Sequence, residues 1–138
     1  MLSRRRLAAL TGLLVATAAL AAPAPDVDRA LRDAKYVYVQ SQRKDGSLGK
    51  TAEIWFFYDG GTVYVASPPT TFRVRRVKAG RTKARIAVGK PDGPTFDATG
   101  RILHDQAIEE KMMAAYAKKY PDGWKTLKPY LRLVKQPK

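Results

Sequence analysis

The stretch of sequence that decides the fold runs from Glu53 to Gly80 and reads EIWFFYDGGTVYVASPPTTFRVRRVKAG. Its first six residues have high β-propensity, and the Asp-Gly-Gly that follows supplies the positive φ angles of a two-residue hairpin turn. The return strand, Thr62 to Ser67, ends at Pro68-Pro69, because proline has no N–H to donate to a neighbouring strand. We therefore predict a β-hairpin over residues 53–67, followed by a short basic helix that ends at Gly80.

Two arginines on this helix form a candidate anion site. Arg73 and Arg76 lie three residues apart, which places them on one helix face, and Thr70 and Thr71 precede the helix as candidate caps. A guanidinium group can donate two hydrogen bonds to one phosphate, while threonine hydroxyls and the free amides at a helix start add donors. These four residues predict a phosphate site. The alternative is a basic helix face that is simply solvated, which a run of charges taken alone favours.

Two short motifs resemble those of the FMN-binding split-barrel superfamily, which comprises the pyridoxamine 5′-phosphate oxidase-like proteins and their deazaflavin-using relatives. The first motif is Ile54-Trp55-Phe56, and the second is Thr71-Phe72-Arg73-Val74-Arg75-Arg76. The resemblance extends from about Leu31 to Trp124. It implies a mainly β, α+β fold in which a small antiparallel split β-barrel has flanking helices, and it implies a homodimer.

The resemblance also implies a function. It predicts an oxidoreductase that binds a flavin-type nucleotide, FMN or a deazaflavin, and acts on an unknown small-molecule substrate. The predicted cofactor-binding residues lie on the hairpin and the basic helix: Thr70, Thr71, Arg73, Arg76 and, near the ring, Trp55. A tryptophan in a strand is more often a core or interface residue. Since the cofactor performs the redox step in such proteins, no catalytic side chain is assigned.

One departure from the family pattern affects the cofactor. Oxidase-type members carry a lysine near the end of the first hairpin strand that contacts the phosphate, whereas this chain has Phe56, Phe57 and Tyr58 there. This favours the deazaflavin branch or a degenerate site, with Arg85 as a candidate replacement for the missing charge. A non-enzymatic protein that binds haem or another anionic ligand on the same scaffold is the alternative function.

His104 is the single histidine, and the chain contains no cysteine. These counts exclude disulfides, thiolate metal sites and clusters of several histidines. His104 is a candidate axial ligand in the haem alternative, although a lone histidine between elements is more often a surface residue. A Ser-His-Asp hydrolase is disfavoured because no nucleophile-elbow sequence is present. We predict no metal site.

The first 21 residues have the pattern of a signal peptide. Arg4-Arg5-Arg6 precede an apolar run from Leu7 to Leu20, and Ala19-Leu20-Ala21 has the small residues of a cleavage site. We therefore expect residues 1–21 to be removed and residues 22–138 to form one periplasmic or secreted domain. The arginines are also compatible with a twin-arginine signal, which would export a folded, cofactor-loaded protein. An uncleaved anchor is the alternative.

The charge of the chain indicates anionic partners. The full sequence has a net charge of +14, and removal of residues 1–21 leaves 23 basic against 12 acidic residues, a net charge of +11. A basic surface of this kind suits a phosphorylated cofactor and weak contact with an anionic membrane surface. Nucleic acid is not expected as a partner of an exported protein.

The remaining elements follow from pattern. We predict a short helix with Asp26 as its N-cap and strands over 36–40, 83–88 and 95–103. Asp105 is the predicted N-cap of a longer helix that extends to Lys119 and whose apolar stripe includes Met112 and Tyr116. Lys90 to Pro94 forms a predicted turn, and Tyr130 to Val134 is a candidate final strand.

Overall fold

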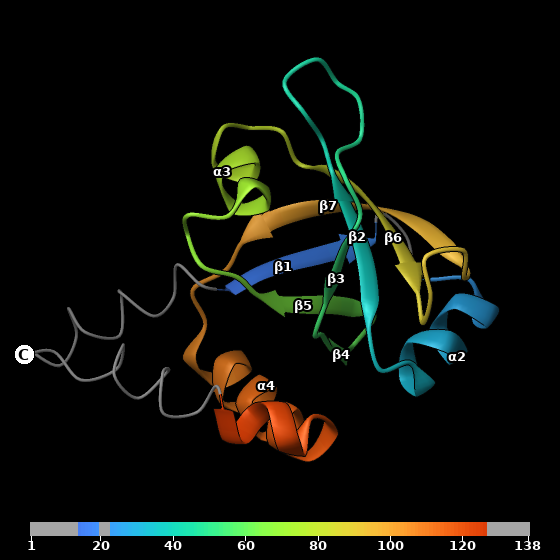
Figure 1. Cartoon of the computed structure of the whole chain (residues 1–138), viewed down its shortest axis with the longest axis vertical. Helices are drawn as coiled ribbons and strands as arrows, with labels where there is room; N and C mark the ends of the chain where they lie inside the picture. The colour runs from blue at the N-terminus through green and yellow to red at the C-terminus, as the bar shows by residue number, and fades with distance from the viewer. Residues whose placement is uncertain (1–13, 20–22, 127–138) are drawn as a thin grey trace, which may run out of the picture.

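The computed structural model describes residues 14–19 and 23–126, so the candidate strand Tyr130 to Val134 lies outside the described residues. The described elements are shown in Figure 1 and are β1 (Leu14–Ala19), α2 (Pro25–Asp33), β2 (Val37–Ser41), β3 (Ala52–Ile54), β4 (Phe57–Asp59), β5 (Thr62–Ala66), α3 (Phe72–Lys78), β6 (Lys83–Val88), β7 (Thr95–Ile102) and α4 (Gln106–Lys119). A further helical segment covers residues 121–126. None of the described helices is long and apolar enough to cross a membrane.

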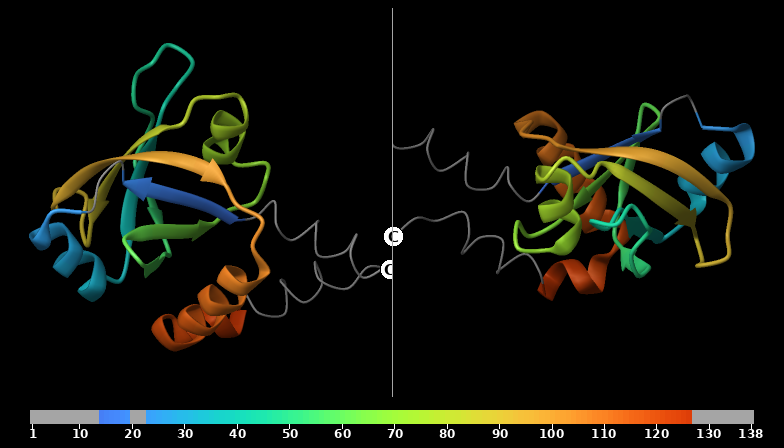
Figure 2. Two further views of the ribbon diagram at one scale, coloured as in Figure 1. Left: turned by 180° about the vertical axis from the view of Figure 1, so that it is seen from behind. Right: turned by 90° about the horizontal axis from the view of Figure 1, so that it is seen from above.

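The described strands form one antiparallel sheet in the order β3-β2-β6-β7-β1-β5-β4. The two ends of this order, β3 and β4, are separated in sequence by Trp55 and Phe56 alone. The sheet must therefore curve until its two ends meet, as the additional views in Figure 2 illustrate. This arrangement is the predicted α+β fold with a small antiparallel split β-barrel and flanking helices.

The hairpin is confirmed, but its first strand is not continuous. Gly60 and Gly61 have φ angles of 57° and 79°, as a two-residue turn with two positive φ angles requires. The predicted single strand over residues 53–58 is wrong, because pairing stops at Ile54 and resumes at Phe57. At Trp55 and Phe56 the chain passes from β3, which pairs with β2, to β4, which pairs with β5. These two residues connect the two ends of the sheet and belong to neither strand pair.

Helix α4 stabilises this break in the barrel wall. The Tyr116 hydroxyl donates to the Trp55 carbonyl at 3.0 Å, and the Tyr120 hydroxyl accepts from the Phe56 N–H at 3.1 Å. Lys119 Nζ lies 3.4 Å from the Phe56 carbonyl oxygen. The Tyr120 hydroxyl also donates to the carbonyl of Lys35. Side chains of α4 thus replace the hydrogen bonds that a strand partner would supply, so these backbone groups are not left unpaired.

Two hydrophobic clusters hold the barrel together. The first fills its interior, where Phe56, Ile86 and Val37 are fully buried and where α2 contributes Leu31 and α3 contributes Val74. The second lies under α4 and contains Tyr64, Met112, Tyr116, Tyr120 and Trp124. The prediction that the apolar stripe of this helix is core is confirmed for Met112 and Tyr116. In Figure 1, α2 and α3 lie at opposite ends of the curved sheet.

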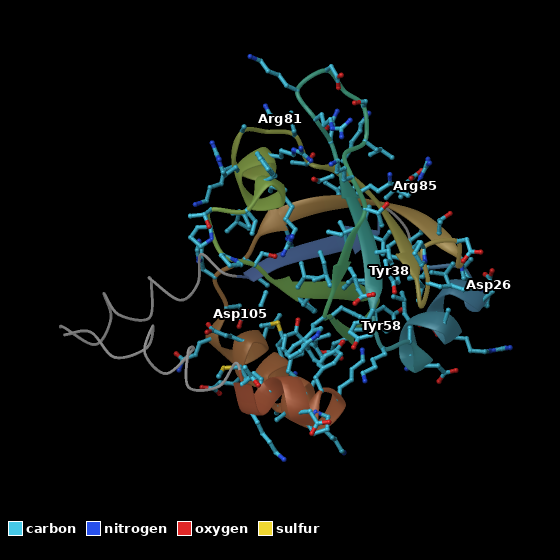
Figure 3. The ribbon with its side chains drawn as sticks, viewed as in Figure 1. Asp26, Tyr38, Tyr58, Arg81, Arg85 and Asp105 are labelled. Carbon is cyan, nitrogen blue, oxygen red and sulfur yellow. The ribbon has the colours of Figure 1, made fainter. Side chains whose placement is uncertain are left out.

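The helix starts differ in how well the sequence predicts them. Asp105 is the N-cap of α4 and accepts a hydrogen bond from the Ile108 N–H at 3.1 Å, as predicted (Figure 3). The N-cap of α2 is Ala24, two residues earlier than the predicted Asp26, because Pro25 occupies the first turn of the helix. Asp26 therefore lies within the first turn of α2 and does not cap it.

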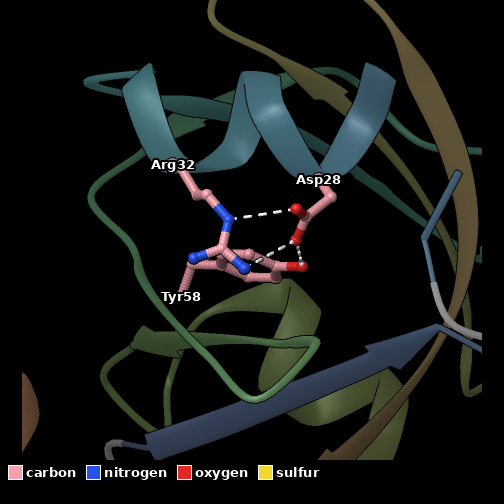
Figure 4. A network of polar contacts seen from close by, with 3 residues as sticks. All are labelled: Asp28, Arg32 and Tyr58. Carbon is pink, nitrogen blue, oxygen red and sulfur yellow. Dashed lines mark hydrogen bonds and ion pairs between the residues drawn. The ribbon is translucent and has the colours of Figure 1, made fainter. Parts of the chain in front are cut away.

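A small polar network attaches α2 to the end of β4 (Figure 4). The Tyr58 hydroxyl donates to Asp28 at 2.6 Å, and Arg32 Nε donates to the same carboxylate at 3.0 Å. The hydrogen bond from Arg32, followed by that from Tyr58, lowers the pKa of Asp28. Burial, followed by the hydrogen bond to Asp28, raises the pKa of Tyr58 to about 12. The network therefore favours an ionised Asp28 and a neutral Tyr58.

Strand β1 consists of residues that the sequence assigns to a signal peptide. In the structure of the whole chain it lies between β5 and β7, with Leu14 opposite Ala66 and Val15 opposite Ile102. The predicted cleavage would therefore remove a strand from the middle of the sheet.

Candidate functional site

A cavity of about 660 Å³ lies between β2, the start of β3 and α3. It is lined by Val39, Ser41, Arg43, Lys50, Thr51, Ala52, Thr70, Thr71, Phe72, Arg73 and Arg76. We call this space the basic cavity, because its lining includes four cationic side chains and no carboxylate. Four of the five predicted cofactor-binding residues, Thr70, Thr71, Arg73 and Arg76, lie on its wall, whereas Trp55 does not.

Arg76 is fixed at the wall by contacts with two other segments. Its Nη1 donates to the Ser41 hydroxyl at 2.8 Å and to the Ser41 carbonyl at 3.3 Å. Gly49 leaves the space that the guanidinium occupies, because a Cβ at this position would lie 2.5 Å from Arg76 Nη1. The guanidinium is therefore held in one orientation before any ligand binds, which reduces the entropy lost on binding.

Arg73 approaches the cavity from the same face of α3. Its Nε donates to the hydroxyl of Ser67 at 2.6 Å, and Ser67 is fully buried behind it. Burial of this guanidinium lowers the pKa of Arg73, but an arginine side chain stays protonated in proteins. Within the described residues, Nη1 and Nη2 of Arg73 make no hydrogen bond, so they can donate to an anion.

The two threonines do not act as the sequence predicted. Thr71 is the N-cap of α3, but its side chain makes no capping hydrogen bond. Its hydroxyl instead donates to the Pro68 carbonyl at 2.8 Å, within the turn that leads into the helix. Thr70 is exposed at the rim. The helix itself covers only Phe72–Lys78, so the anion site depends on side chains and not on the helix start.

The sequence did not identify the other lining residues as site residues, and those with polar or aromatic side chains are Ser41, Arg43, Lys50, Thr51 and Phe72. Phe72 is 70% exposed, and the guanidinium carbon of Arg76 lies 5.4 Å from its ring centroid. An exposed aromatic ring at the rim can stack on a planar ligand. Arg43 and Lys50 flank the loop before β3. Two positive charges on either side of a glycine-containing loop are the sequence feature that could have indicated an anion site here.

Trp55 lies at a second cavity of about 770 Å³, which Glu53, Ile54, Ala66, Tyr116, Gly123 and Thr126 also line. Its ring stacks on that of Tyr120, with centroids 4.3 Å apart and planes 7° apart. A Cβ on Gly123 would lie 2.5 Å from the indole. Trp55 is therefore packed against α4 at the break in the barrel wall, as a structural tryptophan would be. The β3 segment separates this cavity from the basic cavity, since Ala52 lines one and Glu53 the other.

Two further candidates lie away from both cavities. Arg85 pairs with Asp97 of the neighbouring strand at 3.3 Å and does not line the basic cavity (Figure 3), so Lys50 is the better source of the missing charge. His104 is exposed between β7 and α4 and lines neither cavity. The described residues contain no group of three or more His, Cys, Asp or Glu residues that could hold a metal ion.

Comparisons with other proteins identify a family. No curated protein and no solved structure matches the chain at a significant level. Residues 29–135 match a family described as "Uncharacterized protein conserved in bacteria (DUF2255)". This match covers more than half of the chain and includes every residue that lines the basic cavity. The chain therefore belongs to the DUF2255 family of bacterial proteins.

Proposed function

We propose that this protein is an exported oxidoreductase that binds a flavin-type nucleotide, FMN or a deazaflavin, in the basic cavity. The observation that carries the proposal is the convergence of Arg73 and Arg76 with Arg43 and Lys50 on one cavity, whose described lining contains no carboxylate. Such a wall attracts and orients a phosphate, since each guanidinium can form paired hydrogen bonds with its oxygens.

The size and the lining of the cavity agree with this ligand class. Cavities of roughly 300 to 1,000 Å³ are typical of small-molecule and cofactor sites, and the basic cavity has about 660 Å³. Its apolar lining, Val39 and Ala52, lies beside the exposed ring of Phe72 and suits a planar ring system. The phosphate would be held by Arg73 and Arg76, with Thr70 and Lys50 at the rim. Thr71 lines the wall, but its hydroxyl and its N–H both donate to the Pro68 carbonyl.

The protein's own groups bind and orient the ligand. A bound flavin or deazaflavin supplies the hydride or electron transfer. Arg73 and Arg76 would neutralise the phosphate, and Ser41 and Ser67 hold these two side chains in place. Phe72 contributes an exposed aromatic ring to the lining. In the proposed homodimer, the exposed Phe72 and the open side of the cavity are available to a second copy.

A second candidate function is the binding of an anionic ligand in the same cavity without catalysis. Among the described residues that line the basic cavity there is no histidine, carboxylate or tyrosine, and Lys50 is the one side chain of the general acid–base type. This observation also suits a non-enzymatic protein that binds an anionic ligand. Haem as that ligand has less support, because His104 lies outside both cavities.

The first test is the absorbance spectrum of the protein purified from its native host, with mass spectrometry of the molecule that heat releases. A flavin or deazaflavin band at near-stoichiometric occupancy supports the oxidoreductase proposal. A Soret band favours haem. A colourless protein that takes up neither added FMN nor deazaflavin nor haem contradicts the cofactor proposal and leaves the anionic-ligand alternative.

Variants of α3 locate the site. Arg73→Ala and Arg76→Ala should each weaken FMN or deazaflavin binding by tenfold or more, because a hydrogen bond to a charged group contributes roughly 1.5 to 3 kcal/mol. Arg75→Ala is the matched control, since Arg75 is exposed on the same helix and does not line the cavity. An equal effect of all three variants would indicate attraction by net charge and not by a built site.

A further inference from the structure

β1 is the strand that the predicted signal-peptide cleavage removes. Residues 14–19 pair antiparallel with β5 on one side and with β7 on the other. Cleavage after Ala21 takes the whole strand away and leaves the facing edges of β5 and β7 unpaired. Neighbouring strands lie about 4.8 Å apart, so β5 and β7 are then separated by about twice this distance. That separation is too large for direct hydrogen bonds between them.

The two strands that border the space left by β1 contribute residues to the barrel core. Val63 and Val65 of β5 are each 1% exposed, and Ala98 of β7 is 4% exposed. All three are members of the interior cluster. Without an intervening strand, these apolar side chains lose the free energy gained by their burial. The backbone N–H and C=O groups along both strand edges also lose their hydrogen-bond partners. A stable processed protein therefore needs another strand in this position.

We propose that in the processed protein the segment from Tyr130 to Val134 takes the place of β1 between β5 and β7. In its sequence, Tyr-Leu-Arg-Leu-Val, the two leucines lie two residues apart, so a strand formed by this segment has one fully apolar face. Leu131 and Leu133 share one face and turn toward the barrel interior, against Val63 and Val65. Tyr130, Arg132 and Val134 then lie on the outer face.

The described chain ends at the correct place for this exchange. Thr126, its last residue, lines the same cavity as Ala66. Ala66 is the β5 residue that pairs with Leu14, where β1 enters the sheet. A segment that enters from this end runs antiparallel to both β5 and β7, in the direction that β1 has. Residues 127–129 provide a connection of up to about 10 Å.

The family match supports the same exchange. It covers residues 29–135, so it contains the segment from Tyr130 to Val134 and excludes residues 14–19. The strand that completes the barrel in members of the family is therefore expected within the matched region. β1 then acts as a temporary occupant of the gap in the unprocessed chain. This inference rests on the predicted cleavage and requires no bound cofactor, so it can fail or succeed independently of the proposed function.

The test compares the processed protein with a cleavage-blocked chain. The wild-type chain is expressed with export, and mass spectrometry determines its N-terminus. The blocked chain carries Ala21→Leu, because cleavage requires a small residue before the cut bond. Hydrogen exchange is then measured in both proteins over residues 127–138 and over β5, without added cofactor.

We expect the processed protein to begin near Ala22 and its amides at 131–134 to exchange at least about 100-fold more slowly than in an unfolded peptide. In the blocked chain this protection should be lost, with protection at 14–19 in its place. The proposal is overturned if the processed protein exchanges freely at 131–134, if the purified wild-type protein retains residues 14–19, or if both chains protect 131–134 equally.

A pair of substitutions tests the orientation of the segment. Leu133→Asn places a polar group in the barrel interior, so it should reduce the protection of β5 at least tenfold or prevent accumulation of the processed protein. Arg132→Asn is the matched control, because the adjacent side chain lies on the outer face. Equal effects of the two substitutions would contradict the proposed strand. The exchange measurement on the wild-type protein remains decisive if Leu133→Asn does not fold.

Discussion

At the scale of single residues, Gly49 shows how a backbone position can determine a binding site. The residue has no Cβ, and the space is occupied by the guanidinium of Arg76, which also bonds to Ser41. A side chain here must displace the tip of Arg76, because 2.5 Å is too short a distance between a Cβ and a guanidinium nitrogen. The glycine is thus needed for close approach and not for an unusual φ angle.

Gly49→Ala should therefore weaken FMN or deazaflavin binding while leaving the fold intact. Loss of one charged hydrogen bond corresponds to roughly a tenfold or larger increase in Kd. The measurement is fluorescence titration with the cofactor, together with a circular dichroism spectrum. Ser47→Ala, in the same loop but outside the cavity lining, is the control. A Kd equal to that of the wild type would show that the position of Arg76 does not matter for binding.

Lys119 is a second residue whose environment changes its chemistry. Burial lowers the pKa of Lys119 to about 8, and its Nζ lies 3.4 Å from the centroid of the Phe56 ring. A lysine in water has a pKa of about 10.4, so at pH 8 about half of the Lys119 amines are neutral, against less than about 1% for an ordinary lysine.

We expect an amine-acylating reagent at about pH 8 to modify Lys119 before Lys118, because the neutral amine is the nucleophile. Peptide mass spectrometry after limited labelling gives the order. Lys118 is the control because it is the exposed neighbour on the same helix. Slower labelling of Lys119 than of Lys118 at both about pH 8 and about pH 10 would contradict the lowered pKa.

At the scale of elements, the break between β3 and β4 depends on α4. The hydroxyls of Tyr116 and Tyr120 form hydrogen bonds with the backbone at Trp55 and Phe56. The Tyr120 hydroxyl also donates to the Lys35 carbonyl. A barrel whose wall is interrupted in this way is closed by side chains instead of by strand pairing. The helix and the hairpin are therefore expected to unfold together.

Tyr120→Phe should destabilise the protein by about 1 to 3 kcal/mol, because it leaves two backbone groups without that partner. Urea unfolding followed by circular dichroism measures the change. Tyr64→Phe is the control: Tyr64 is also buried under α4, and its hydroxyl makes no hydrogen bond within the described residues. If the free energy of unfolding falls equally in both variants, the loss is a general effect of removing a tyrosine hydroxyl. It would then not reflect the hydrogen bonds at the break between β3 and β4.

At the scale of the whole molecule, buried tyrosines make the fold sensitive to alkali. The pKa values of Tyr58 and Tyr120 are raised to about 12, mainly by burial, and that of Tyr116 is raised further by the same cause. The unfolded value is about 10. Below about pH 10 both states are protonated, so the stabilisation is fully present, and it is lost as the pH rises from about 10 through about 12.

The free energy of unfolding should therefore fall between about pH 9 and about pH 11, because the unfolded chain releases protons that the folded chain retains. Urea unfolding at the two pH values tests this, and tyrosinate absorbance reports the ionisation directly. Tyr58→Phe should reduce the slope. A free energy of unfolding that does not change over this range would contradict the raised pKa values.

The proposed exchange of β1 for residues 130–134 also belongs to the whole molecule, because it would decide whether the barrel is closed once the predicted signal peptide is removed. The mature fold would then depend on which end of the chain reaches the gap between β5 and β7. This competition follows from two apolar segments of similar length at opposite ends of the sequence.

The sequence by itself determined the local elements. Alternation, glycine pairs, prolines and caps predicted the hairpin, β6 and the start of α4, because each of these depends on residues close together in the chain. The same reasoning found Arg73 and Arg76, since their spacing on one helix face is local. It misplaced the start of α2, because Pro25 is favoured in a first helical turn and shifts the N-cap to Ala24, and it missed the break at Trp55 and Phe56.

Only the tertiary structure decided the contacts between distant segments. Arg76 meets Ser41 and Gly49, and Tyr120 meets Phe56 and Lys35, across many residues of sequence. No local pattern encodes such pairs, because the free energy of each depends on how the sheet curves and on which strand lies beside which. For the same physical reason, composition alone could not show that residues 14–19 can act as a strand in the centre of the sheet.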